Sequence, residues 1–278
     1  MINQPTNHHV HLPTVHVNIG NHHHPPSNIS GHRTRPSLNI HRLLPKLHQK
    51  KKNNVPTVQD LSQDLIPIIG QVKFAAVIHN LFSHQECAEL IKMTEKRGYT
   101  DALVHGPNGT EILRRDIRNS GRCIIDDEDL AQSWFERMVQ ALEGSVIKDR
   151  LFDAHWLANH EANPRKNRRL HAVGLNERLR FLRYHPGQYF GIHKDNAFTR
   201  GEDFGPRAGE ESHLTFLLYL NDKMEGGQTR IESCGRYLDV VPETGSVFVF
   251  DHDILHEAIK ITAGRKYCCR TDVMFCSE

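Results

Sequence analysis

The first 59 residues lack acidic side chains altogether, although they contain seven lysines and arginines. The formal net charge of +2 therefore hides an asymmetry, because the rest of the chain sets 28 basic residues against all 33 acidic ones. This segment also holds ten of the 21 histidines and too few large apolar residues to bury a core. We expect it to be a disordered, His-rich basic tail through about residue 65.

Several functions are open for this tail. His22, His23 and His24 could bind metal adventitiously, and Lys50 to Lys52 could form a basic targeting signal. The tail also resembles an organelle transit peptide, because such leaders are poor in acidic residues and contain Arg and Ser. The simplest interpretation is a solvated extension without a function of its own.

Long apolar runs are also missing, since none approaches the roughly 18 residues that a membrane-spanning helix needs. The N-terminus lacks the short apolar core of a secretory signal. The six cysteines include no C-x-x-C pair, so reduced thiols are expected rather than a disulfide framework. These absences favour an intracellular, reducing compartment, the cytoplasm or the nucleus, and exclude no particular oligomeric state.

Two helices are predicted between the tail and the C-terminal half. Ser83 and Glu86 form a capping-box pattern that opens a helix ending near Gly98. A second amphipathic helix starts near Asp126 or Asp127 and ends near Gly144. We assign residues 66–278 to one domain, with helical support at about 83–160.

Short strands dominate the remainder, about residues 178–276. Runs such as 213–221, 246–250 and 265–275 are apolar and β-rich, and turn residues separate them. No helical segments alternate with them, which excludes a parallel βαβ sheet and favours an antiparallel jelly roll. The predicted fold is mostly β with flanking α-helices and a double-stranded β-helix core.

One stretch of this region carries a metal-binding pattern. In a strand, side chains at positions i and i+2 lie on the same face, so His193 and Asp195 can direct an imidazole and a carboxylate at one point. A non-haem Fe(II) oxygenase needs this pair and one further His. In a chain with 21 histidines the pair alone is weak evidence.

The third donor should come from a later strand, and the segment 251–257 offers His252 and His256. These two residues also imitate the His-Glu-x-x-His motif of zinc proteases. That motif needs a helix and a Glu, whereas here a β run precedes the string and Asp253 occupies the position of the Glu. A zinc hydrolase is therefore disfavoured.

Residues 180–275 resemble the 2-oxoglutarate/Fe(II) oxygenase domain of the prolyl 4-hydroxylase type. Four blocks match in order: Tyr-His-Pro-Gly-Gln-Tyr-Phe-Gly-Ile-His-Lys-Asp at 184–195, the segment 215–221 ending in Tyr-Leu-Asn, Glu-Gly-Gly-Gln-Thr-Arg at 225–230, and residues 242–275. The resemblance covers the helices loosely and the tail not at all.

The resemblance implies that His193, Asp195 and His256 are iron ligands, which would leave His252 as a neighbour at the surface. It implies that Lys266 pairs with the far carboxylate of 2-oxoglutarate, because a buried dicarboxylate requires a cation. Arg270 shares the strand face of Lys266 and is the alternative cation. The other matched cosubstrate positions are Tyr184, Tyr219 and Thr229. For the two tyrosines the alternative is a packed ring with its hydroxyl at the surface.

The implied activity is hydroxylation of an aliphatic C–H bond with Fe(II), 2-oxoglutarate and O2, giving succinate and CO2; ascorbate is a further candidate cofactor. A prolyl residue of a protein or peptide is the leading substrate. A small-molecule or nucleic-acid oxygenase is the second hypothesis, although the acidic balance of the domain disfavours nucleic acid. A non-catalytic peptide- or metal-binding module is the third.

Overall fold

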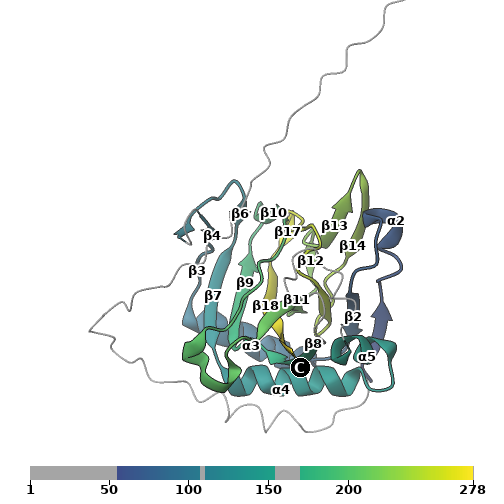
Figure 1. The fold of residues 1–278 in the computed structure, drawn as a ribbon. Coiled ribbons are helices and arrows are strands. Elements are labelled where there is room, and N and C mark those ends of the chain that lie inside the picture. The colour runs from purple at the N-terminus through teal and green to yellow at the C-terminus, as the bar shows by residue number, and fades with distance from the viewer. Residues whose placement is uncertain (1–54, 107–109, 154–169, 278) are drawn as a thin grey trace, which may run out of the picture. The chain divides into compact units, whose positions relative to one another are not determined.

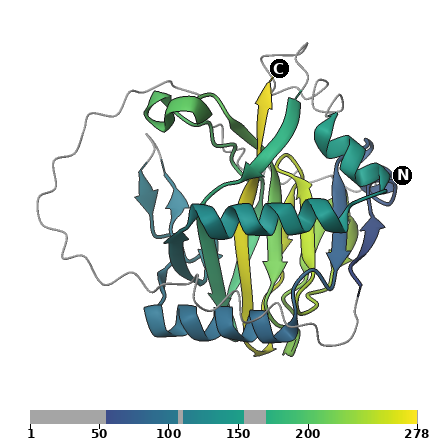
Figure 2. The same cartoon turned by 90° about the horizontal axis from the view of Figure 1, so that it is seen from below.

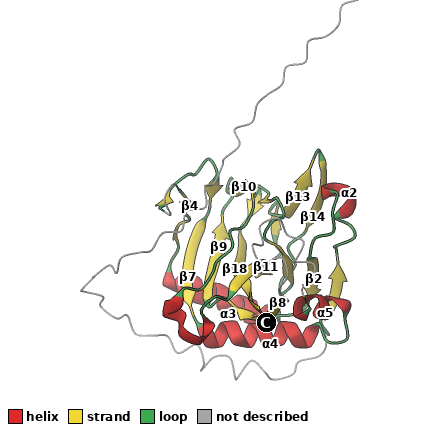
Figure 3. Ribbon diagram, viewed as in Figure 1, coloured by secondary structure: helices red, strands yellow, loops and turns green. Residues whose placement is uncertain are grey.

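The computed structural model describes residues 55–106, 110–153 and 170–277. The tail up to residue 54 and the segment 154–169, which includes the end of the predicted helical region, lie outside the described residues. Within the described part, β-strands form two main sheets and two short ribbons, and the longer helices gather along one side (Figures 1 and 3).

The larger sheet has nine strands, and all its neighbours are antiparallel. Its order is β1 (Thr57–Asp60), β2 (Ala75–His79), β15 (Val247–Asp251), β11 (Glu211–Tyr219), β18 (Lys266–Ser277), β9 (Arg178–Tyr184), β7 (Gly121–Asp126) and β3 (Thr100–Asp101), with β8 (Leu170–Leu175) also paired to β18.

The smaller sheet has five strands in the order β14 (Arg236–Val240), β13 (Thr229–Ser233), β16 (His256–Ala258), β10 (Tyr189–His193) and β6 (Arg118–Asn119). Two short ribbons accompany it: β12 (Met224–Glu225) with β17 (Ala263–Gly264), and β4 (Val104–His105) with β5 (Glu111–Ile112).

Successive core strands alternate between the two sheets. β9, β11, β15 and β18 belong to the larger sheet, whereas β10, β13 and β16, which lie between them in sequence, belong to the smaller one. The two sheets enclose a shared apolar core that includes Leu182, Leu217, Ile231, Val240 and Phe250. This alternation confirms the predicted double-stranded β-helix core and brings distant strands side by side.

The helices are α2 (Ile66–Ile69), α3 (His84–Arg97), α4 (Glu128–Ala141), α5 (Val146–Phe152) and the 3-10 helix η4 (Glu202–Arg207). The predicted capping box at Ser83 and Glu86 is present, and α3 ends at Gly98 as expected. Asp127 caps α4 by accepting a hydrogen bond from the amide of Leu130.

Helices α3 and α4 run across the strands of the larger sheet (Figure 2). The Trp134 ring of α4 stacks 6.2 Å from Phe216 of β11 and lies 5.1 Å from Phe82. Side chains alternate along β11, so Phe216 faces the helices while Thr215 and Leu217 face the interior. The helices thus cover the outer face and leave the space between the sheets for chemistry. No helix among the described residues is long and apolar enough to cross a membrane.

The boundary expected at residue 65 is too late. Thr57 to Asp60 form β1, which pairs with β2 at the edge of the larger sheet, and Leu61 and Leu65 are buried. Sequence reasoning missed this strand because its four residues carry no pattern of their own. Its stability depends on pairing with β2.

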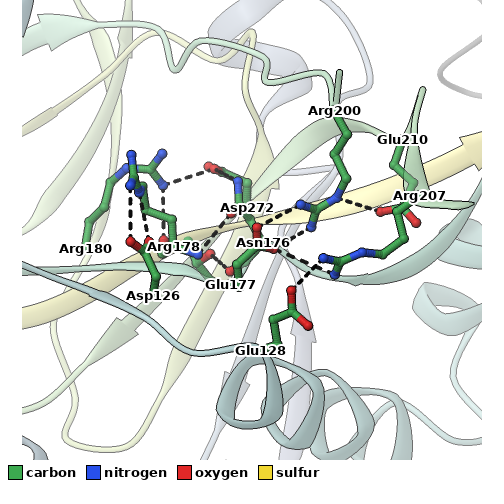
Figure 4. A network of polar contacts seen from close by, with 11 residues as sticks. Asp126, Glu128, Asn176, Glu177, Arg178, Arg180, Arg200, Arg207, Glu210 and Asp272 are labelled. Carbon is green, nitrogen blue, oxygen red and sulfur yellow. Dashed lines mark hydrogen bonds and ion pairs between the residues drawn. The ribbon is translucent and has the colours of Figure 1, made fainter. Parts of the chain in front are cut away.

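The segment 200–212 is tied down by ion pairs (Figure 4). Arg200, which is 3% exposed, bridges Glu177 and Glu210, and Arg207 contacts Glu128 at the start of α4. These contacts fix the approach to β11.

Candidate metal centre

The structure brings His193, Asp195 and His256 together in the interior between the sheets. His193 ends β10, Asp195 follows two residues later, and His256 opens β16, which pairs with β10 at this point. One donor atom from each residue lies within 4.8 Å of the others. The fold therefore assembles the donor set that spacing and resemblance predicted.

Both imidazoles are oriented in the same way by a backbone carbonyl. The Nδ1 of His193 lies 2.8 Å from the Gly191 carbonyl, and the Nδ1 of His256 lies 2.9 Å from the Ile254 carbonyl. A carbonyl can only accept, so Nδ1 carries the proton in each ring and the Nε2 lone pair is left for a metal. Each Nε2 lies 3.8 Å from a different oxygen of Asp195.

The protonation states also suit a metal. Burial and the charge of His256 lower the pKa of His193 to about 3, and burial lowers the pKa of His256. Burial opposes ionisation of Asp195, but the neighbouring basic groups, Arg270 foremost, together outweigh it and hold the pKa of Asp195 below its usual range. Two neutral imidazoles and one carboxylate are the donors of the Fe(II) facial triad, so the residues fit this ion.

Asp195 is held by two further side chains. The Arg270 guanidinium lies 3.2 Å from Oδ1, and the Thr215 hydroxyl donates to Oδ2 across 2.5 Å. Thr215 was missed as a site residue, although it shares the inward face of β11 with the predicted Tyr219. Arg270 also lies 3.0 Å from Asp272, so its charge is matched by two carboxylates. Its predicted role as the alternative anchor for 2-oxoglutarate does not fit these contacts.

Asp272 extends this network to two further side chains. Its other carboxylate oxygen accepts hydrogen bonds from Arg180 at 3.2 Å and Asn176 at 3.5 Å (Figure 4). His252 was expected at the surface, but it is buried, with Nε2 3.6 Å from Asp272. His252 lies outside the group of three donors that the structure brings together. Its burial follows from the turn after β15, which directs the ring inward.

Lys266 is enclosed nearby, at the start of β18. It is 2% exposed, and its ammonium donates to the Gly227 carbonyl at 2.5 Å. Burial lowers its pKa. A Cβ on Gly227 would lie 3.2 Å from the Lys266 side chain and 2.6 Å from Ile261, so a glycine is needed for the strand to pass this close.

The predicted cosubstrate residues surround this ammonium. It lies 5.8 Å from the ring of Tyr184 and 5.3 Å from that of Tyr219. The Tyr219 hydroxyl is 2.7 Å from that of Thr229, and all three residues are buried. Neither tyrosine sends its hydroxyl to the surface, which rules out the alternative considered for them.

Arg118 on β6 is a further residue that sequence reasoning missed. Its guanidinium lies 4.6 Å from the ring centroid of Phe190, and the Phe190 ring stacks 3.5 Å from that of His193. Within the described part of the chain its Nε is buried without a hydrogen-bond partner. β6 has only two residues, so no strand pattern in the sequence could have revealed that Arg118 faces the site.

Comparison with known proteins decides the family. Residues 179–271 match the profile of the 2OG-Fe(II) oxygenase superfamily. A PKHD-type hydroxylase of Acinetobacter baumannii (strain SDF) is 31% identical over 190 residues, which are 68% of this chain and 73% of that protein. The chain belongs to the 2OG-Fe(II) oxygenase superfamily. It is an oxidoreductase of the dioxygenase class, and its relatives use Fe(II), 2-oxoglutarate and O2.

Other relatives of this superfamily member are named prolyl 4-hydroxylases or PKHD-type hydroxylases. Probable prolyl 4-hydroxylase 8 of Arabidopsis thaliana is 24% identical over 228 residues, covering 73% of this chain and 69% of the relative. A PKHD-type hydroxylase of Crocosphaera subtropica matches over only 32% of this chain and 38% of its own length, at 31% identity. A solved Pseudomonas putida prolyl-4-hydroxylase has a TM-score of 0.49 and 17% identity, covering 77% of this chain and 96% of that one.

Proposed function

We propose that this chain is an Fe(II)- and 2-oxoglutarate-dependent hydroxylase in which His193, Asp195 and His256 hold the ferrous ion. The observation that carries the proposal is the convergence of these three donors, with both Nε2 lone pairs and the carboxylate directed at one point. Bound there, iron would supply the activation of dioxygen and the oxidation of the substrate. The protein orients the reactants and excludes water, since Asp195 and His256 are nearly inaccessible.

Lys266 binds the far carboxylate of 2-oxoglutarate in this proposal. An enclosed ammonium with one carbonyl partner is costly unless an anion joins it, and a carboxylate supplies charge-assisted hydrogen bonds. Tyr184, Tyr219 and Thr229 line the same space and direct the dicarboxylate toward the triad. The cosubstrate leaves as succinate and CO2.

The substrate we propose is a prolyl residue of a protein or peptide. Support comes from the prolyl 4-hydroxylase names of curated relatives. Arg118 adds a physical reason, because its Nε–H is buried without a hydrogen-bond partner and its guanidinium lies beside the Phe190 ring that stacks on His193. A peptide carbonyl is a suitable acceptor for this donor.

The test uses the full-length chain with Fe(II), 2-oxoglutarate and proline-containing peptides, with and without ascorbate. We expect peptide-dependent formation of succinate and a peptide mass increase equal to one oxygen atom, both abolished in His256→Ala. Turnover stimulated by metabolites and by none of the peptides would instead favour the small-molecule alternative. Absence of succinate under every condition would contradict the hydroxylase itself.

A further inference from the structure

The turn between β15 and β16 sets the direction of one metal donor. Asp251 Oδ1 accepts a hydrogen bond from the amide of Asp253 at 2.9 Å, and the Ile254 amide donates to the Asp251 carbonyl at 3.1 Å. The Ile254 carbonyl in turn orients the His256 ring. The conformation of this turn therefore determines where the Nε2 of His256 points.

Two lysines from other parts of the chain hold the turn through Asp253. Lys73, which precedes β2 and has a side chain only 9% exposed, donates to Oδ2 of Asp253 at 3.1 Å and lies 3.8 Å from Asp251. Lys194 contacts the other carboxylate oxygen of Asp253. We call Lys73, Lys194 and Asp253 the Asp253 cluster.

The position of Lys194 in the sequence gives the cluster its significance. Lys194 lies between the donors His193 and Asp195, so its side chain leaves the metal-binding segment on the side away from the ion. A backbone hydrogen bond also connects this segment to the turn between β15 and β16, because the Asp195 amide donates to the His252 carbonyl at 3.0 Å. The segment with two donors and the turn with the third are thus joined at two points.

The ion pairs that Lys194 and Lys73 form with Asp253 differ in how strongly water screens them. The Lys194 side chain is 50% exposed, so solvent screens its ion pair with Asp253. Exposed pairs of this kind contribute little to stability. Lys73 is largely removed from water, so its contact with Asp253 is screened less. Neither pair is needed to build the β-sheets, and the consequence of losing them should therefore be local.

We propose that Asp253 is a positioning residue for the metal centre, which fixes the turn carrying His256 against the segment carrying His193 and Asp195. This inference rests on the metal-binding role proposed above. Without the carboxylate, the turn loses its contact with Lys194 and its closer contact with Lys73, and the Nε2 of His256 is held less firmly at the common point.

The experiment measures Co(II) binding to the full-length chain by calorimetry and by the visible spectrum of the bound ion. We expect Asp253→Asn to weaken Co(II) binding by about 10-fold, as loss of an outer partner of a metal ligand does, and to change the spectrum at saturating metal. Asp253→Glu, which retains the charge, should recover most of the affinity. Glu143→Gln, which breaks the exposed Lys148–Glu143 pair, is the matched control and should behave as wild type.

Lys194→Met provides an independent test, because this half-exposed residue can be changed without disturbing the core. It should weaken Co(II) binding, and its combination with Asp253→Asn should lose less than the sum of the two effects. Wild-type affinity and spectrum in Asp253→Asn and Lys194→Met would overturn the positioning role alone. Failure of the wild-type chain to bind Co(II) through His256 would overturn the metal site and the positioning role together.

Discussion

The Thr215 hydroxyl donates a hydrogen bond to Asp195 Oδ2 across 2.5 Å, joining β11 of the larger sheet to a donor that follows β10 of the smaller one. Asp195 is the one anionic member of the triad, and Thr215 with Arg270 fixes the plane of its carboxylate. The orientation of the charged donor therefore depends on the sheet opposite to the one that carries both histidines.

Thr215→Val keeps the shape of this side chain and removes the hydroxyl. We expect Mn(II) or Co(II) to bind roughly 10-fold more weakly, because a hydrogen bond to a charged acceptor contributes about 1.5–3 kcal/mol and part of this is recovered by relaxation. Calorimetric titration measures the change. Thr100→Val, at an exposed position of β3, is the control, and equal losses in both variants would contradict the role of Thr215.

His256→Ala and His252→Ala separate the donor from its buried neighbour. We expect His256→Ala to abolish succinate formation in a protein that still folds. His252→Ala should lower the free energy of unfolding by about 1–3 kcal/mol, since the ring is buried, and leave most of the succinate formation. Turnover assays paired with thermal unfolding distinguish the two effects. The reverse pattern of activity would show that the wrong histidine was assigned to the metal.

Lys266→Met should affect cosubstrate binding and stability in opposite directions. The variant removes the charge partner of the 2-oxoglutarate carboxylate, and loss of a buried charge partner weakens the binding free energy by about 2–5 kcal/mol. The KM for 2-oxoglutarate should therefore rise roughly 30-fold or more. The apoprotein should be as stable as wild type or more stable, because the enclosed ammonium has been removed. Lys92→Met on α3 is the control. An unchanged KM would show that a cation other than Lys266 binds the far carboxylate of 2-oxoglutarate.

Lys266 also predicts a pH dependence of stability. Burial lowers its pKa in the folded state below the ordinary value of 10.5, so the unfolded chain binds more protons between these two values. The free energy of unfolding of the wild-type protein, relative to that of Lys266→Met, should therefore increase as the pH rises toward 10.5. It should decrease as the pH falls from 10.5 toward the lowered pKa of the folded state. Thermal unfolding of both proteins across this range measures the difference. A difference independent of pH would show that the ammonium is not destabilised by burial.

Metal binding should release no protons from the histidines near neutral pH. The pKa of His193 is lowered to about 3 and that of His256 lies below its ordinary value of 6.5, so both rings are mostly neutral at pH 7.5. Calorimetry in buffers of different ionisation enthalpy should find close to zero protons released on Co(II) binding at pH 7.5. Release of one or two protons would mean that the rings are charged before the metal binds.

Local patterns in the sequence were enough for much of the architecture. The capping box at Ser83 and Glu86, the ends of α3 and α4, and the strands of the β core depend on short-range preferences and on alternation, and these lie in consecutive residues. The donors His193 and Asp195 belong to the same category, because one strand fixes their common face. His256 and Lys266 required the resemblance to choose among neighbours.

The sequence by itself thus determined the class of fold and the donor types, whereas the family resemblance singled out His256 and Lys266. Tertiary structure alone decided the pairing of Arg270 with Asp195, the hydrogen bond from Thr215, the burial of His252 and the contacts of Asp253 with two lysines. Each of these relationships joins strands or turns that are distant along the chain. Only the packing of one sheet against the other sets such distances, and no local preference encodes them.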